Sequence, residues 1–250
     1  MPSFESMAIV GLTFLIAGSV KGVTGLGLPS VSLALLTATL GLKAAMAILI
    51  VPSFATNIWQ ALVGSHLWAI LRRTWSLLVA ICVATWFGAG VLAKANADLL
   101  AGLLGLVLCI YSACGLMRVD PGSPGRHEPW LSPIVGTVSG MLNGMTGSFV
   151  VPGVLYLQSL RFPRDGFIQS MGVLFTTSTV ALAAALQKEQ LLSRELAALS
   201  VIAVAPALAG MVVGQVIRRR LSDDVFRTIF FAALLGLGIY IAIRAIAGLW

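Results

Sequence analysis

Long stretches without a charged residue constrain this chain more than any other feature of its sequence. A helix needs roughly 20 apolar residues to cross about 30 Å of hydrocarbon. Most of the uncharged stretches are long enough for one crossing, and 129–160 is too long for a single simple one. They cover 22–42, 44–71, 74–93, 99–117, 129–160, 166–187, 196–217 and 228–243. Only 10% of the residues are charged, against about 25% in soluble domains. We therefore expect an all-α, polytopic transmembrane helical bundle.

Within these stretches the sequence predicts ten hydrophobic segments. They are 6–27, 28–42, 45–65, 75–93, 98–117, 131–147, 148–160, 166–187, 195–217 and 225–247. The second and the seventh would reach only about 20–23 Å as helices, so we expect them to be tilted or re-entrant.

The order of segment lengths repeats, which predicts two transmembrane repeats, 1–117 and 131–250, joined by the linker 118–130 within one integral membrane domain. Each repeat opens with a glycine-rich interruption. Thr24-Gly25 lies 122 positions before Thr146-Gly147, whereas Gly18 and Gly22 lie 118 positions before Gly136 and Gly140. We attribute the difference to an insertion of about one helical turn, and this alignment places Lys21 opposite Ser139. Chance matches among 26 glycines are the alternative.

The distribution of basic residues distinguishes two possible topologies, because Lys and Arg accumulate in cytoplasmic loops. Ten segments give five per repeat and an inverted arrangement, whereas eight crossings give a parallel one. With ten segments, ten basic residues share one face, in the loops 72–73, 118–126, 161–164 and 218–227, and five lie on the other. With eight crossings the division is eight against seven, and Lys21 is left out of both counts. The inverted reading has the clearer bias and predicts that both termini lie outside. We thus attribute the net charge of +7 to basic residues that orient the protein in the membrane, and we expect no nucleic-acid binding.

The first interruption combines a cation with helix-breaking residues. Lys21 lies between the apolar runs 7–20 and 22–42, and a charge at membrane depth usually faces a cavity or a partner. Gly22, Gly25 and Gly27 can adopt backbone angles that other residues avoid, and Pro29 favours a new helix start. Such a break would direct a helix N-terminus at a bound anion. The second half-site would come from Gly140, Gly144, Gly147 and Pro152. Snorkelling of Lys21 to an interface, and close helix packing by the glycines, are the alternatives.

Polar residues on other segments extend the candidate site. Ser53, Thr56, Asn57 and Gln60 share one helical face, and Gln169 lies in the matching region of the second repeat. They would line a polar path or act as interhelical hydrogen bonds. The predicted substrate-binding residues are Lys21, Gly22, Thr24, Gly25, Gly27, Pro29, Asn57, Gln60, Gly140, Asn143, Gly144, Thr146, Gly147, Pro152 and Gln169.

Catalytic and metal-binding patterns are missing from the sequence. It has three dispersed cysteines, two histidines and no HExxH, Walker or GxSxG motif, and all nine acids fall at predicted segment ends or loops. We expect no enzyme activity, no cofactor and no metal.

The glycine-rich interruptions, the Pro52…Asn57-x2-Gln60 pattern and the two-repeat layout together resemble the sulfite exporter TauE/SafE family of membrane permeases. The resemblance covers nearly the whole chain, and Leu28 and Phe149 stand where that family often has further glycines. It implies a bacterial inner-membrane, multi-pass protein that transports sulfur-containing anions such as sulfite or organosulfonates.

The expected function is therefore secondary transport of a small anion, bound at the midplane between the two repeats. The expected partners are that anion, the bilayer and a coupling ion, either a proton or sodium. A homo-oligomer is left open. A passive anion channel and a non-transporting scaffold subunit are the alternative functions.

Overall fold

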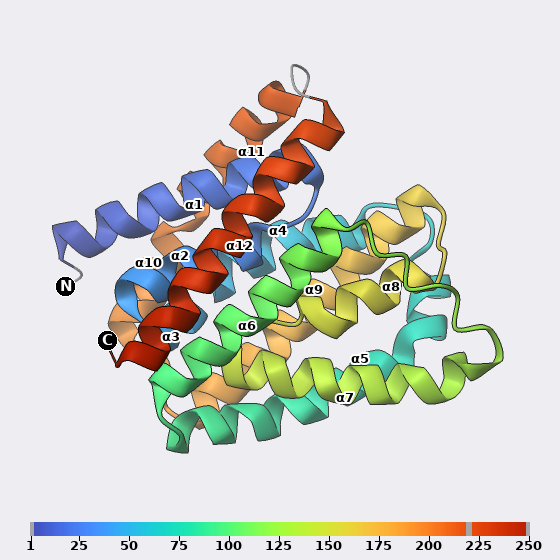
Figure 1. Ribbon diagram of the computed structural model, residues 1–250, viewed down its shortest axis with the longest axis horizontal. Coiled ribbons are helices and arrows are strands. Elements are labelled where there is room, and N and C mark those ends of the chain that lie inside the picture. Colours follow the sequence, from blue (N-terminus) through green and yellow to red (C-terminus); the bar gives the residue numbers. More distant parts are fainter. Residues whose placement is uncertain (1–2, 219–221, 249–250) are drawn as a thin grey trace. The chain divides into compact units, whose positions relative to one another are not determined.

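The computed structural model describes residues 3–218 and 222–248, and these ranges form helices and connecting turns without a strand. The first helices are α1 (Phe4–Thr24), α2 (Leu28–Leu40), α3 (Leu42–Ile48), α4 (Ile50–Leu62), α5 (Leu67–Lys94) and α6 (Ala97–Leu116) (Figure 1). The later ones are η1 (Gly125–His127), α7 (Glu128–Thr146), η2 (Val150–Val154), α8 (Leu155–Ser159), α9 (Arg164–Lys188), α10 (Arg194–Ile202), α11 (Val204–Arg218) and α12 (Asp223–Ala247). The helical bundle predicted from the sequence is confirmed, and the ten segments agree with these bounds to within a few residues at most ends.

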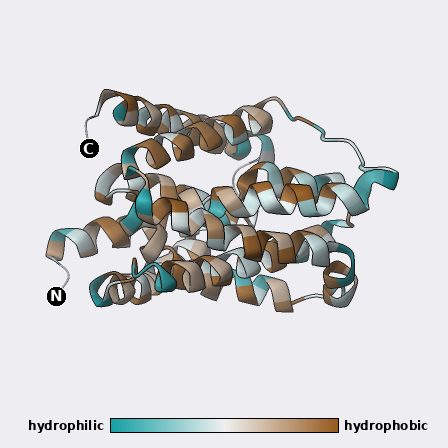
Figure 2. Ribbon diagram, turned by 90° about the horizontal axis from the view of Figure 1, so that it is seen from below, coloured by the Kyte–Doolittle hydropathy of each residue, from teal (hydrophilic) through white to brown (hydrophobic). Residues whose placement is uncertain are grey.

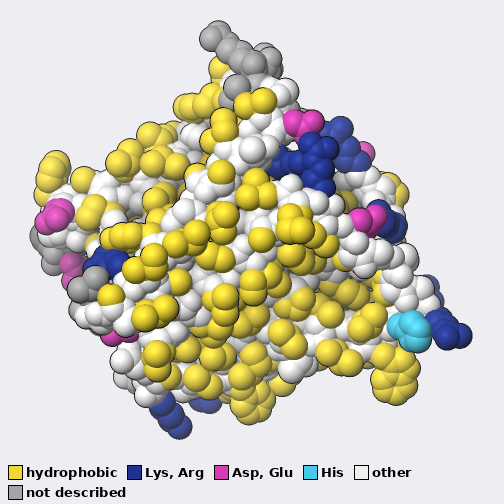
Figure 3. Space-filling view, in the orientation of Figure 1, with side chains coloured by type: hydrophobic (Ala, Val, Ile, Leu, Met, Phe, Trp, Pro, Cys, Tyr) yellow, Lys and Arg dark blue, Asp and Glu magenta, His cyan; other side chains and the backbone are white. Residues whose placement is uncertain are grey.

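Six stretches of the described residues are long and apolar enough to cross a membrane, and the bent pair α3–α4 would be a seventh. The six are α1, α5, α6, α9, α12 and the continuous stretch of α10 and α11. Hydrophobic residues run along the helices, whereas many of the hydrophilic ones lie at helix ends and in loops (Figure 2). Hydrophobic side chains also cover most of the face in Figure 3. The α2 helix would reach only about 20 Å and the stretch 150–159 about 15 Å, so neither can cross the hydrocarbon as a straight helix.

The third predicted segment is split into α3 and α4 by a bend of 42°. Pro52 causes it, because proline lacks the N–H that would bond to the Ile48 carbonyl one turn earlier. The Ser200 hydroxyl on α10 takes over this role and donates to the Ile48 carbonyl at 2.7 Å. The same oxygen accepts the Val51 N–H at 3.0 Å. One side chain thus satisfies two backbone groups that the bend has freed.

The chain forms two compact units, and each combines segments from both sequence repeats. Unit 1 comprises Met1–Pro52, Asn96–Val119 and Leu191–Trp250, and unit 2 comprises Ser53–Ala95 and Asp120–Gln190. In unit 1, α1 packs along α11, and α6 packs along α12 (Figure 1). In unit 2, α5 packs along both α7 and α9.

Glycines allow these helices to touch main chain to main chain. In unit 1, a Cβ atom on Gly18 would collide with the Ala207 carbonyl, and one on Gly22 with the Met211 carbonyl. In unit 2, a Cβ atom on Gly140 would collide with the Ile81 carbonyl, and one on Gly144 with the Thr85 carbonyl.

The two glycine seams match residue by residue. Gly18 and Gly22 on α1 precede Gly140 and Gly144 on α7 by 122 positions. The residues that the α7 glycines contact, Ile81 and Thr85, precede those that the α1 glycines contact, Ala207 and Met211, by 126 positions. Within α1, α7 and the break after each, this register needs no insertion, so the contacts favour an offset of 122 there over the split alignment inferred from the sequence. The four-residue difference falls later in the repeats, before α5 and α11.

The α6 and α12 helices run antiparallel and touch main chain to main chain at Gly105 and Gly238. A Cβ atom on Gly105 would lie 2.6 Å from the Gly238 carbonyl oxygen, and one on Gly238 would lie 2.9 Å from the Gly105 carbonyl oxygen. Gly102 lies near Ala245, while Gly115 lies against Phe231. The residue numbers on α12 fall as those on α6 rise, which sets the antiparallel direction.

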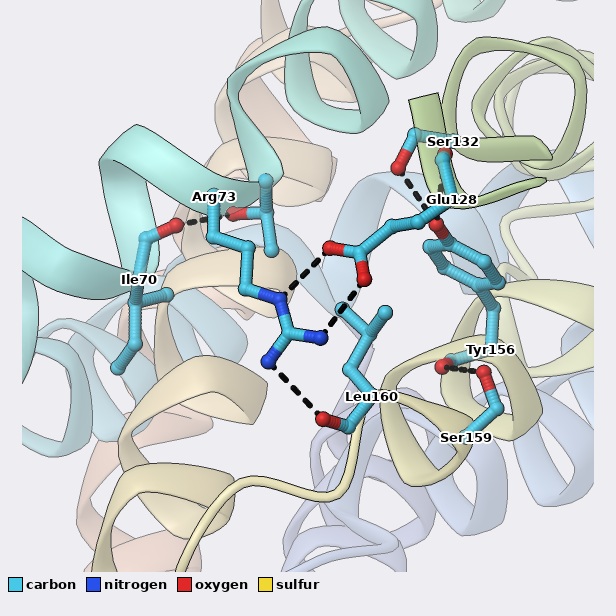
Figure 4. A network of polar contacts seen from close by, with 8 residues as sticks. Ile70, Arg73, Glu128, Ser132, Tyr156, Ser159 and Leu160 are labelled. Carbon is cyan, nitrogen blue, oxygen red and sulfur yellow. Dashed lines mark hydrogen bonds and ion pairs between the residues drawn. The ribbon is translucent and has the colours of Figure 1, made fainter. Parts of the chain in front are cut away.

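Charged residues hold loop ends of unit 2 together. Arg73 forms a two-fold ion pair with Glu128, with distances of 2.6 and 2.7 Å, and also donates to the Leu160 carbonyl at 3.0 Å (Figure 4). Arg161 pairs with Asp120 at 2.6 Å. Residues near 73, 120–128 and 160–161 therefore share one end of this unit, as the ten-segment topology requires. In the eight-crossing topology, 161 would lie at the opposite end from 73 and 120.

Unit 1 brings together two further basic loops, because Arg118 forms an ion pair with Asp224 at 2.7 Å. Arg219 and Arg220, which the charge count also assigned to this face, lie outside the described residues.

Candidate functional site: two broken helices

The first break follows α1 and depends on two glycines with left-handed backbone. Gly25 has φ 77°, and its N–H donates to the Lys21 carbonyl at 2.7 Å. Gly27 has φ 93° and precedes α2, where Pro29 lies in the first turn. A Cβ atom on Gly25 would meet nothing within 4 Å, so the backbone conformation, and not lack of space, requires glycine here. The predicted break and helix restart are present.

Lys21 lies in the last turn of α1 with only 3% of its surface exposed. Thr24 shapes the turn that follows. Its hydroxyl accepts the Leu26 N–H at 3.0 Å and lies within hydrogen-bonding distance of the Val20 and Leu26 carbonyls. Thr24 therefore stabilises the break through its contacts with the backbone.

The second break, after α7, repeats this arrangement. Gly147 has φ 76°, and its N–H donates to the Asn143 carbonyl at 2.7 Å. The Thr146 hydroxyl donates to the Leu142 carbonyl at 2.7 Å and accepts the Ser148 N–H at 3.2 Å. Every one of these residues lies 122 positions after its counterpart in the first break. Lys21 therefore corresponds to Asn143, and the alignment with Ser139 is corrected.

The two breaks differ in the segment that follows. Pro29 opens a regular helix, whereas Pro152 lies within η2, where Val151 has non-helical angles of φ −119° and ψ 129°. The peptide bond between Val151 and Pro152 is cis. The backbone after Gly147 is thus irregular over a longer stretch.

Asn143 is fully buried and links three helices of unit 2. Its Nδ2 atom donates to Thr85 Oγ1 on α5 at 3.1 Å and to the Ser178 carbonyl on α9 at 3.0 Å. Its Oδ1 atom has no hydrogen-bond partner among the described residues. Neither Thr85 nor this partnership was predicted, because Thr85 lies within an ordinary apolar run and carries no sequence signal.

Three of the predicted glycines serve helix packing. Gly22, Gly140 and Gly144 lie inside regular helices, with a neighbouring main chain where a side chain would be. For them the structure agrees with the packing alternative, while Gly25, Gly27 and Gly147 supply the breaks.

The predicted amides on α4 and α9 lie together in unit 2. Gln60 Nε2 donates to the Ile168 carbonyl at 2.8 Å. Gln169 Nε2 donates to the Ala61 carbonyl at 2.9 Å, and its Oε1 accepts the His66 N–H at 3.0 Å. Both glutamines thus join α4 and its following turn to α9, as interhelical hydrogen bonds do. Asn57 lies on α4 and is fully buried.

The acids described in this structure lie at helix ends or in loops. Glu5, Asp98, Glu128, Asp165 and Glu195 are in the first turns of their helices. The described ranges hold no group of three or more His, Cys, Asp or Glu residues suited to a metal ion. Among the described residues, the first break has the buried Lys21, and the second has the neutral Asn143 at the corresponding position.

Comparison with known proteins bears on the whole chain. The family described as "Sulfite exporter TauE/SafE" matches residues 10–241. Searches of curated proteins and of solved structures found no significant match. Because the family match covers nearly all of the chain, this multi-pass membrane protein belongs to the sulfite exporter TauE/SafE family.

Proposed function

We propose that this protein is a secondary transporter of a small sulfur-containing anion, such as sulfite or an organosulfonate. The observation that carries the proposal is the buried ammonium of Lys21 at the break between α1 and α2. A cation within a membrane span is costly and is usually retained for an ion or substrate. Membership of the sulfite exporter TauE/SafE family supports sulfur-containing anions as the substrate class.

The backbone beside Lys21 adds a second attraction for an anion. The α2 helix starts directly after the break, and its first N–H groups have no carbonyl partner within the helix. The positive end of the helix dipole lies at the same point. Lys21 and this helix start together would bind an oxyanion without any further charged side chain.

We propose further that the two sequence repeats are inverted and that the protein transports its substrate by alternating access. The matched glycine seams support a duplication in which α1 pairs with α11 as α7 pairs with α5. The α6–α12 contact supports the inversion. The α6 helix ends the first repeat and α12 ends the second, so a two-fold axis that relates the repeats also relates these two helices. Since these helices are antiparallel, that axis would lie across them, in the plane of the membrane. Binding of the substrate at the midplane is a proposal that follows from the duplication.

Thermal unfolding of the purified protein with different anions tests the binding proposal. Sulfite, sulfate, thiosulfate, sulfoacetate, taurine and short carboxylates would be compared at equal ionic strength. A specific ligand raises the melting temperature by mass action. We expect one group of these anions to do so, and Lys21→Ala to abolish the shift. The matched control is Lys94→Ala at the end of α5, which should leave it intact. No shift with any anion would falsify the proposed anion site.

Saturable counterflow in proteoliposomes separates a transporter from a passive channel, which gives none. Lys21→Ala distinguishes both from a scaffold subunit, whose function would survive the substitution.

A further inference from the structure

The break after α7 contains buried oxygen atoms that the anion proposal does not use. We propose that Asn143 and the hydroxyls around it form a binding site for a monovalent cation, for which Na⁺ is the probe. The proposal deepens the transport function and rests on it for the role of Na⁺ as the coupling ion.

The orientation of the Asn143 amide is fixed by its partners. The Ser178 main-chain carbonyl can only accept a hydrogen bond, so the atom 3.0 Å from it must be Nδ2. The second Nδ2 hydrogen is directed at Thr85 Oγ1, 3.1 Å away. Both donors are therefore engaged. The remaining Oδ1 is a buried acceptor without a hydrogen-bond partner among the described residues, and a cation satisfies such an atom.

Further buried hydroxyls lie on α7, in the break after it and on the α9 helix that Asn143 contacts. Ser139 lies one turn before Asn143 on α7, and its Oγ would be 3.1 Å from a Cβ atom placed on Gly153 in η2. Ser178 lies on α9, and its main-chain carbonyl is already bonded to Asn143. The hydroxyls of Ser139, Ser148 and Ser178 are buried and lack hydrogen-bond partners within the described ranges. Hard cations are bound by such neutral oxygens.

The backbone favours a cation over an anion at this break. Both α1 and α7 present the negative C-terminal end of a helix dipole to the break that follows them. Only the first break leads directly into a regular helix, whose positive N-terminal end opposes that charge. The non-helical stretch at Val151 interrupts the regular backbone pattern, and unwound carbonyls of this kind coordinate Na⁺ in other transporters with broken helices. An anion would find the Asn143 donors already engaged.

The corresponding positions of unit 1 lack these oxygens. Under the shared register, Ser139 and Ser148 correspond to Ala17 and Leu26. Thr85 on the packing partner corresponds to Met211. At these three positions the oxygens therefore accompany Asn143, while the first break carries the fixed cation Lys21. We infer that the second break uses an exchangeable cation where the first has a covalently attached one.

Thermal unfolding in NaCl, KCl and choline chloride, without a sulfur anion, tests this site. We expect a saturable rise in melting temperature of roughly 2–5 °C with NaCl. Asn143→Ala and Ser139→Ala should reduce this rise. The matched control is Ser112→Ala on α6 of unit 1, which removes a fully buried hydroxyl far from either break in sequence and should keep the rise intact.

Asn143→Lys supplies a second, sharper variant, because it places a fixed ammonium where Lys21 has one. We expect this variant to fold and to lose its response to Na⁺. Equilibrium binding of radioactive Na⁺ to the wild type provides a readout that does not depend on variant stability. Equal melting temperatures in the three salts together with no bound Na⁺, or an undiminished Na⁺ response in Asn143→Lys, would overturn the proposal.

The outcomes separate this site from the proposed function. An anion response that depends on Lys21, without any Na⁺ response, removes only the cation site. A Na⁺ response without any anion response keeps the site and removes the anion transporter.

Discussion

Gly22 on α1 and Gly214 on α11 meet with their main chains in contact, since a Cβ atom on Gly22 would lie 3.0 Å from the Gly214 Cα atom. Gly144 and Gly88 meet in the same way between α7 and α5. No side chain separates the helices at either point, so these seams set the closest approach of each pair.

Replacing Gly22 by Val should therefore lower the stability of the folded protein by about 3 kcal/mol or prevent folding, because main chains cannot move aside as side chains do. Thermal unfolding in detergent measures the effect. Gly11→Ala is the control on the same helix, since a Cβ atom there meets nothing within 4 Å. It should change stability by less than about 1 kcal/mol. Comparable losses in both variants would contradict a tight seam.

Ser200→Ala should destabilise unit 1 by about 2–4 kcal/mol, because it leaves both the Ile48 carbonyl and the Val51 N–H without their partner. Thr137→Ala is the control, because its exposed hydroxyl bonds only to a carbonyl of its own helix. Unfolding curves of the two variants give the comparison. An equally small effect of both would show that the Pro52 bend does not need Ser200.

The ion pair between Arg73 and Glu128 should show a coupling energy of about 0.5–1 kcal/mol in a double-mutant cycle with Arg73→Ala and Glu128→Gln. The value is modest because the two side chains are 38% and 20% exposed. Arg73→Lys should lose most of it, since lysine cannot form the two-fold contact. Additive single-variant effects would mean that the pair contributes nothing to stability.

Acid should weaken the contact between Asp120 and Arg161. The Arg161 guanidinium, aided by the Gly122 N–H, holds the pKa of the Asp120 carboxyl below its usual range. A carboxyl with a lowered folded-state pKa stabilises the protein above its unfolded-state value, about 4, and this stabilisation is lost as the pH falls below that value. We expect the melting temperatures of wild type and Asp120→Asn to differ slightly at pH 6 and to converge near pH 3. A difference that is constant across this range would disprove the linkage.

The orientation predicted from basic loops can be read by labelling single cysteines at positions 3 and 123 in a background without Cys82, Cys109 and Cys114. An impermeant thiol reagent applied to intact cells should label position 3 and leave position 123 unreacted. Labelling of position 123 from outside would reverse the topology.

The helical segments were predictable because uncharged length alone identifies a membrane span. The bend in the third segment was predictable only in part. Pro52 indicates a possible break, but nothing near it in the sequence indicates that Ser200 stabilises the bend, because Ser200 lies 152 positions after Ile48. The glycine register was ambiguous for a physical reason. Gly136, Gly140 and Gly144 repeat every four residues, so a shift by one turn fits the sequence equally well, and only the packing partners decide it.

The chemistry of the site was predicted in part. A lysine in an apolar run can be recognised from the sequence, because burying its charge in a membrane span is energetically unfavourable. The structure places Lys21 buried at the break. The acceptor character of Asn143 was invisible, because it depends on Thr85 and Ser178, at separations of 58 and 35 residues.

The pairing of α1 with α11 has a consequence for biosynthesis. The ribosome finishes α1 about 180 residues before it begins α11, which at 5–20 residues per second corresponds to a delay of about 10–40 s. During that interval the Gly18–Gly22 face of the first inserted helix has no packing partner. The α7 helix emerges after its partner α5 and can dock at once. The nascent chain should therefore complete the α5–α7 pair first, and a truncation before α11 should leave α1 as a target for membrane quality control.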